Sequence, residues 1–154
     1  SLSNPYTGIL SIFSTRLLNG NNIDIYEDGQ ESRDFVYIDD VVDATILALE
    51  KEEANHQIFN VGSGVATTVR EVANTLKSLY NSDVTISISG KYRLGDIRHN
   101  YADLSKIKNN LGFSPKFDFM AGITSFVKWV KTQEVMEDKY ESSIEELKQK
   151  GLIK

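Results

Sequence analysis

Apolar residues recur at helical spacing in several stretches of this chain. The clearest stretch is Val69–Tyr80, where apolar residues three or four positions apart form one stripe. Thr68 stands just before it and Glu71 three residues further on, which is the pattern of a capping box at a helix start. The same spacing predicts helices at Thr7–Leu18, after Asp39 and Asp40 (which can cap the helix), at Leu104–Leu111, after Asp118, and at Val135–Lys150.

Short extended segments lie between these helices. Val84–Ser89 alternates β-branched and small polar residues, the pattern of a half-buried strand. Ile23–Tyr26, Asp34–Ile38 and Gln57–Val61 are compact runs that also predict strands. The chain has no repeat, no low-complexity segment and no linker-like stretch, so the pattern predicts one α/β domain over residues 1–154, with short strands flanked by helices.

Composition supports an ordinary folded domain. The 154 residues are 40% hydrophobic and 25% charged, which is enough for a core without disulfides or a structural metal. Cysteine is absent, and no apolar run approaches the roughly 20 residues of a membrane span. We therefore expect a soluble, cytoplasmic protein that does not bind membranes. The formal net charge of −5 and the lack of a Lys/Arg cluster also argue against nucleic acid as a partner.

The glycine-rich run GSGVAT follows a strand candidate and precedes a helix, as a dinucleotide-binding loop would. However, the third glycine of such a loop is replaced by Thr67, and the acidic residue expected after the next strand is replaced by Ser89 and Gly90. This run predicts a tight turn and no cofactor site. With only His56 and His99 and no cysteine, the sequence also offers no metal site and no nucleophile–histidine pair.

Three motifs follow one another in the chain: RDFVYIDDVVDA from Arg33, FNVGSG from Phe59, and RLGDIRHNYAD from Arg93. DGQESRDFV, ADLSK and LGFSP extend the pattern to Pro115. In this order the motifs resemble the C-terminal, substrate-binding portion of nucleotide-sugar epimerases and dehydratases of the extended short-chain dehydrogenase/reductase family, of the UDP-glucose 4-epimerase type. The resemblance implies a small substrate-binding domain that lacks the N-terminal Rossmann domain. A first residue other than methionine likewise predicts truncation.

The resemblance also implies a set of substrate-binding residues: Arg33, Arg93, Asp96, Tyr26, Asp24, Ile25, Val65 and Asn100. Arg33 and Arg93 match two arginines that grip the nucleotide diphosphate, which planar guanidinium groups can bind bidentately. Asp96 matches a carboxylate that accepts a hydrogen bond from the ribose. Arg98 is a further arginine near this motif that could contribute positive charge to an anion site.

The remaining matches concern the base and the sugar. Tyr26 matches an aromatic residue beside the base, where a flat ring can stack on a pyrimidine. Asp24 and Ile25 are expected to supply backbone contacts from the same strand, and Val65 an apolar wall. Asn100 matches a position that helps to select the sugar. Tyr26 and Val65 are alternatively ordinary core residues, and Trp129 is expected in the core.

The catalytic pair of the resembling family is missing. There, a lysine four residues after a tyrosine lowers the pKa of the tyrosine, which acts as a general base. None of the seven tyrosines here is followed by lysine at that distance, so we expect no catalytic residues. NAD belongs to the full-length protein, and this portion is expected to bind none.

These observations predict the UDP- or dTDP-sugar-binding part of an NAD-dependent epimerase that is inactive alone. A dehydratase or decarboxylase, and a free-standing, non-enzymatic binding module, remain alternatives. The expected partners are the nucleotide-sugar and the missing Rossmann domain. Without that domain, an exposed interdomain face favours self-association.

Overall fold

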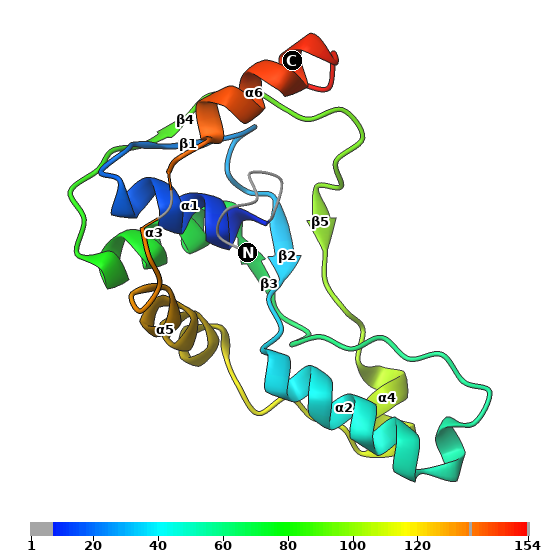
Figure 1. Ribbon diagram of the computed structural model, residues 1–154. Coiled ribbons are helices and arrows are strands. Elements are labelled where there is room, and N and C mark those ends of the chain that lie inside the picture. The colour runs from blue at the N-terminus through cyan, green and yellow to red at the C-terminus, as the bar shows by residue number, and fades with distance from the viewer. Residues whose placement is uncertain (1–7, 136, 154) are drawn as a thin grey trace. The chain divides into compact units, whose positions relative to one another are not determined.

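A computed structural model describes residues 8–135 and 137–153 of the chain (Figure 1). Its α-helices are α1 (Ile9–Leu18), α2 (Ile38–Glu50), α3 (Val69–Tyr80), α4 (Ser105–Leu111), α5 (Phe119–Val130) and α6 (Tyr140–Gln149). Its strands are β1 (Ile23–Ile25), β2 (Ser32–Asp34), β3 (Ala66–Thr68), β4 (Ile86–Ile88) and β5 (His99–Asn100), and a short 3-10 helix, η1, covers Glu52–Ala54. The chain therefore has the predicted α/β fold of short strands flanked by helices.

The fold divides into two compact units, each of which the chain enters more than once. The first unit takes in residues up to 31, residues 68–98 and residues from 125 onward, and the second takes in residues 32–67 and 99–124. The expectation of a single domain over the whole chain stays a prediction.

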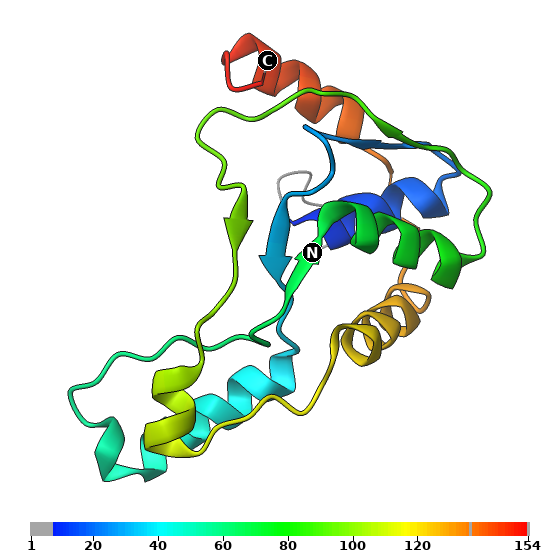
Figure 2. The ribbon, with the colours of Figure 1, turned by 180° about the vertical axis from the view of Figure 1, so that it is seen from behind.

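The first unit is built on a two-stranded parallel sheet. Ile23 of β1 pairs with Ile86 of β4, and Ile25 pairs with Ile88. Figures 1 and 2 show α6 on one side of this pair and α1 with α3 on the other. The buried apolar side chains of this unit are Phe13, Leu17, Ile23, Ile25, Val72, Ala73, Leu76, Val127, Val130, Ile144 and Ile153.

The second unit contains a three-stranded sheet in the order β3-β2-β5. β2 and β5 run parallel, with Ser32 opposite His99 and Arg33 opposite Asn100. α2 and α4 lie side by side in both views (Figures 1 and 2). They bury a small core of Ala44, Ile107, Leu111 and Phe113, against which Leu47 and Leu104 are partly buried.

Helix ends follow local chemistry where that chemistry is strong. α3 covers the predicted residues, and the Thr68–Glu71 capping box forms in both directions. Asp118 accepts a hydrogen bond from the Ala121 backbone at 2.7 Å at the start of α5, as predicted. Gly112 ends α4 with a φ of 70°, a left-handed conformation that glycine adopts without strain.

Asp39 and Asp40 do not cap α2 as predicted. The helix begins at Ile38, so both residues lie in its first turn, where negative charge suits the helix dipole. Asp40 is only 1% exposed, and its carboxylate accepts hydrogen bonds from the backbone of Lys116 at 2.8 Å and of Phe117 at 3.2 Å. Asp40 therefore fastens the segment before α5 onto α2.

Other sequence-based predictions were wrong in their bounds or their burial. Gln57–Val61 forms no strand in the described structure, and Ile38 belongs to a helix and not to the strand predicted at Asp34–Ile38. Trp129 is 49% exposed and is not a core residue. The α6 helix begins at Tyr140, five residues later than predicted, and Thr7, the predicted start of the first helix, lies outside the described residues.

Candidate functional site

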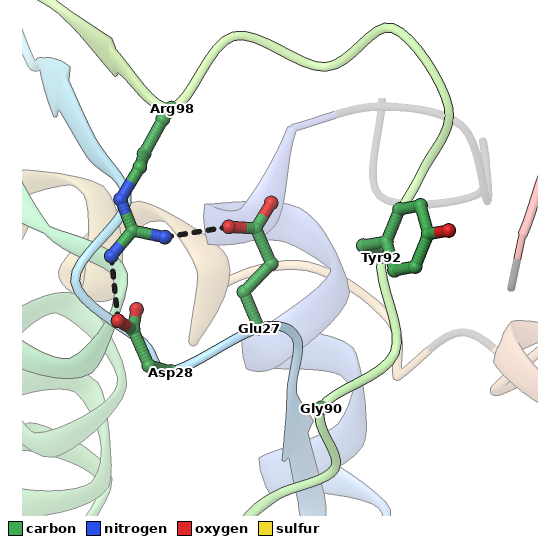
Figure 3. Close-up of a pocket in the computed structure, with 5 residues that line it drawn as sticks. All are labelled: Glu27, Asp28, Gly90, Tyr92 and Arg98. Carbon is green, nitrogen blue, oxygen red and sulfur yellow. Dashed lines mark hydrogen bonds and ion pairs between the residues drawn. The ribbon is translucent and has the colours of Figure 1, made fainter.

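An ion-pair cluster holds two loops of the first unit together. Arg98 donates hydrogen bonds to Glu27 at 2.7 Å and to Asp28 at 2.6 Å (Figure 3). These three residues, with Gly90 and Tyr92, line a cavity of about 440 Å³. The charge of Arg98 is thus engaged by carboxylates on the turn after β1. This pairing fixes the loop that carries the RLGD motif to the turn that follows Tyr26.

A third carboxylate belongs to the cluster. Glu31 lies 3.7 Å from Arg98 and is buried, and burial together with the neighbouring Glu27 carboxylate raises the pKa of Glu31. Hydrogen bonding to the Gln30 backbone and to Arg98 lowers the pKa of Asp28. Glu27 has a positive φ of 45°, an uncommon backbone conformation for this residue, in the turn that presents its carboxylate to Arg98.

Two predicted ligand residues meet in the first unit. The Arg93 guanidinium carbon lies 5.8 Å from the centre of the Tyr26 ring, within the range of a cation–π interaction. Arg93 Nε is buried and has no hydrogen-bond partner among the described residues. An unpartnered guanidinium N–H beside an aromatic ring suits an anionic ligand with a flat group, such as a nucleotide.

Asp96 lies on the same loop as Arg93, close to it in sequence. Its backbone N–H donates to the Arg93 carbonyl at 3.4 Å, and its carboxylate accepts from the Ile97 backbone at 2.9 Å. The side chain is exposed, so a carboxylate oxygen can still accept a hydrogen bond from a ligand hydroxyl. The loop therefore presents an arginine and a carboxylate three positions apart.

Asp24 and Ile25 occupy β1 as predicted, but the contacts they make are within the protein. The Asp24 carboxylate forms a 2.8 Å ion pair with Lys91, which raises the pKa of Lys91. Ile25 is buried, and its carbonyl accepts hydrogen bonds from the backbone and the hydroxyl of Ser89. Their predicted backbone contacts to a ligand stay predictions.

The second unit carries the other three predicted residues. Arg33 and Asn100 are opposite one another on β2 and β5, and Arg33 donates a 2.9 Å hydrogen bond to the Ser32 carbonyl. Val65 is 59% exposed, so the alternative view of Val65 as a core residue is wrong. The sheet thus brings Arg33 next to the proposed sugar-selecting residue, although the two are 67 positions apart in sequence.

Asp34 organises the glycine turn of the second unit and was missed by sequence reasoning. Its carboxylate accepts hydrogen bonds from the Ser63 backbone at 2.7 Å, the Ser63 hydroxyl at 2.6 Å, the Gly64 backbone at 2.9 Å and the Ala102 backbone at 3.1 Å. Burial favours a higher pKa, but these hydrogen bonds outweigh it and lower the pKa of Asp34. A Cβ atom on Gly62 would collide with the same carboxylate. The NVGSG motif is therefore a turn closed by Asp34, which agrees with the sequence interpretation.

Neither a candidate metal cluster nor a candidate membrane-spanning helix occurs among the described residues. Across residues 8–135 and 137–153, no group of three or more His, Asp or Glu side chains could hold a metal ion. In the same part of the chain, no helix is both long enough and apolar enough to cross a bilayer. The predicted polar ligand residues are arginines, which bind anionic groups, and a tyrosine, carboxylates and an amide, which can form hydrogen bonds with a ligand's hydroxyl groups.

Comparison with known proteins agrees with this chemistry. Residues 3–62 match the family described as "NAD dependent epimerase/dehydratase family". The chain is 38% identical over 130 residues to dTDP-L-rhamnose 4-epimerase of Burkholderia thailandensis, a match that covers 84% of this chain and 36% of that protein. It is 33% identical over 126 residues to UDP-glucose 4-epimerase of Mycolicibacterium smegmatis, covering 82% of this chain and 40% of that protein.

Solved structures show the same relationship. UDP-glucose 4-epimerase of Thermotoga maritima, crystallised with UDP-glucose, superposes with a TM-score of 0.72 at 35% identity, over 84% of this chain and 41% of that one. UDP-N-acetylglucosamine 4-epimerase of Methanobrevibacter ruminantium, in complex with UDP-N-acetylmuramic acid, gives a TM-score of 0.77 at 30% identity, over 86% and 42% of the two chains. The chain belongs to the NAD-dependent epimerase/dehydratase family of extended short-chain dehydrogenases, and it spans about two fifths of the length of these relatives.

Proposed function

We propose that this chain is the nucleotide-sugar-binding part of an NAD-dependent sugar epimerase, and that its ligand is a UDP- or dTDP-sugar. The observation that carries the proposal is the Arg93–Tyr26 pair, with the buried and unpartnered Nε of Arg93. A diphosphate supplies the hydrogen-bond acceptor that this N–H group lacks, and a pyrimidine supplies a flat face on which the tyrosine ring can stack. Asp96, on the same loop, accepts a hydrogen bond from a ribose hydroxyl.

The other predicted residues complete the proposal. Arg33 binds the diphosphate, Val65 forms an apolar wall for the nucleotide, and Asn100 contacts the sugar. The chain contains no Tyr-x-x-x-Lys pair. We therefore propose that it performs no turnover alone and that NAD binds to another part of the full-length protein. In this proposal, the tyrosine general base, its partner lysine and hydride transfer belong to the full-length protein.

Titration calorimetry of the 154-residue chain with UDP and with dTDP tests the proposal. We expect both ligands to bind, and Arg93→Ala to weaken both by about 10- to 100-fold, because a charge-assisted hydrogen bond contributes about 1.5–3 kcal/mol. ADP is the control for the base, and Lys77→Ala, an exchange of a cation on α3, is the control for net charge. Absence of UDP and dTDP binding, even with a separately supplied NAD-binding domain of an epimerase, would contradict the proposal.

A dehydratase or decarboxylase is the second candidate. It is favoured by the 30% identity to a UDP-N-acetyl-α-D-glucosaminuronate decarboxylase of Bacillus cytotoxicus and to a dTDP-glucose 4,6-dehydratase of Actinoplanes. Product analysis with the complete protein separates these reactions, because only an epimerase returns a sugar of unchanged composition. A non-enzymatic binding module would bind the nucleotide and give no product in any of these assays.

A further inference from the structure

The C-terminal helix α6 reaches the aromatic residue of the proposed nucleotide site. The Tyr140 hydroxyl donates a hydrogen bond to the Tyr26 hydroxyl at 3.2 Å, across 114 positions of sequence. Burial and the neighbouring Tyr26 raise the pKa of Tyr140, so it is the neutral donor at physiological pH. The sequence pattern predicts a helix over Val135–Lys150, and the motifs end at Pro115, so none of the predicted ligand residues lies in this stretch.

Arg16 of α1 fixes Tyr140 in place. The Arg16 guanidinium carbon lies 4.3 Å from the centre of the Tyr140 ring, and Arg16 Nη1 donates to Glu141 at 3.2 Å. The same nitrogen lies 3.4 Å from Asp138, and Arg16 Nε donates to the Asn22 carbonyl at 2.5 Å. Arg16 is only 8% exposed and Asp138 is also largely shielded from water, whereas the Glu141 side chain is 79% exposed. Arg16 therefore links α1 to the start of α6 mainly through Asp138 and the Tyr140 ring.

The residues after α6 reach the arginine of the same site. Ile153 forms an antiparallel bridge with Arg93, and the Leu94 backbone N–H donates to the Leu152 carbonyl at 3.0 Å. Ile153 is itself buried. The C-terminal stretch therefore contacts the two residues that form the cation–π pair, Tyr26 through a side chain and Arg93 through the backbone.

We infer that Asp138–Ile153 is part of the nucleotide site, and that Tyr140 is a positioning residue that sets the orientation of the Tyr26 ring beside the base. The inference rests on the proposed function and extends it to a segment outside the motifs. Tyr140 acts through Tyr26 and need not touch the ligand. A tyrosine hydroxyl that accepts from Tyr140 keeps its own proton, which it can donate to a ligand oxygen.

Tyr140→Phe tests the inference, because it removes the hydrogen bond and keeps the ring under Arg16. We expect UDP to bind the 154-residue chain about two- to tenfold more weakly, because binding must then order a Tyr26 ring that Tyr140 no longer holds in place. The affinity for UMP should fall by the same factor, because UMP and UDP share the base that Tyr26 is proposed to contact. Tyr101→Phe, at a tyrosine that is 59% exposed, is the matched control and should leave both affinities unchanged.

A double-mutant cycle separates positioning from general stability. Tyr26→Phe removes the acceptor of the same bond, so Tyr140→Phe should cost no further affinity when added to it. The inference would be overturned if Tyr140→Phe lowered the thermal unfolding temperature and left the UDP affinity unchanged. It would also be overturned if Tyr140→Phe weakened UDP binding and not UMP binding, or if the losses of UDP affinity in the two single variants were additive in the double variant. Absence of UDP binding by the unmodified chain would instead contradict the proposed function. If Tyr140→Phe does not fold, the inference is judged by Tyr26→Phe, which must weaken UDP and UMP equally.

Discussion

At the scale of single residues, charged side chains with several partners hold the loops of this protein together. The Asp34 carboxylate accepts four hydrogen bonds, from the glycine turn and from Ala102. The Arg98 guanidinium forms ion pairs with three carboxylates, those of Glu27, Asp28 and Glu31. In each case a charged group lies among partners that satisfy it, so the loops that carry the motifs have one preferred geometry.

Asp34→Asn should destabilise the second unit. An amide can accept with only one oxygen, so at least one of the backbone N–H groups now bonded to the carboxylate loses its partner, at a cost of about 1–3 kcal/mol. Urea denaturation at pH 7 measures the change. Asp103→Asn is the control, since that exposed carboxylate accepts hydrogen bonds from Ser105, two residues further along the chain.

The pH dependence of stability gives a second readout of the same group. The pKa of Asp34 is lower in the folded state than its ordinary value of 3.8, so its contribution is fully present above that value and is lost as the pH falls through the folded pKa. The difference in unfolding free energy between the native chain and Asp34→Asn should therefore shrink below about pH 4. A difference that stays constant from pH 7 to pH 3 would contradict this account.

At the scale of secondary structure, capping explains why α3 matches its prediction when other elements do not. Thr68→Ala removes the side chain that accepts from the Glu71 backbone, and we expect a loss of about 0.5–2 kcal/mol in unfolding free energy. Ser78→Ala, at an exposed position in the same helix, should be neutral or slightly stabilising, because alanine is the better helix former. Equal effects of the two substitutions would show that the capping box contributes nothing.

Strands were harder to predict than helices. β3 and β5 contain three and two residues, too few to show an alternating pattern, and they form because β2 lies between them. Gln57–Val61 has the composition of a strand and forms none, because a strand needs a neighbour to share its hydrogen bonds. The start of α2 was misplaced because Asp40 serves a tertiary contact and not a cap.

At the scale of the whole molecule, α2 presents an apolar stripe to solvent. Ile38, Val42, Ile46 and Leu49 are between 45% and 81% exposed. The relatives have additional chain that this protein does not match, and a stripe of this kind suits contact with such a part. The 154-residue chain alone is therefore expected to self-associate.

Leu49→Glu should reduce that self-association with little loss of stability, because Leu49 is 81% exposed. Sedimentation velocity over a range of concentrations measures the monomer fraction. Asn110→Glu adds the same charge at another exposed position of the second unit and serves as the control. If both variants associate as the unmodified chain does, the α2 stripe is not the surface involved.

The sequence by itself determined the family, the α/β class, the capped α3 helix and the glycine turn, because short motifs and periodic patterns express local chemistry directly. Only the tertiary structure decided that Asp34 closes the turn, that Arg98 is paired with carboxylates, and that α6 holds Tyr26 through Tyr140. These contacts join residues 29 to 114 positions apart. Nothing in local propensity encodes such pairs, since they exist only when folding brings distant segments together.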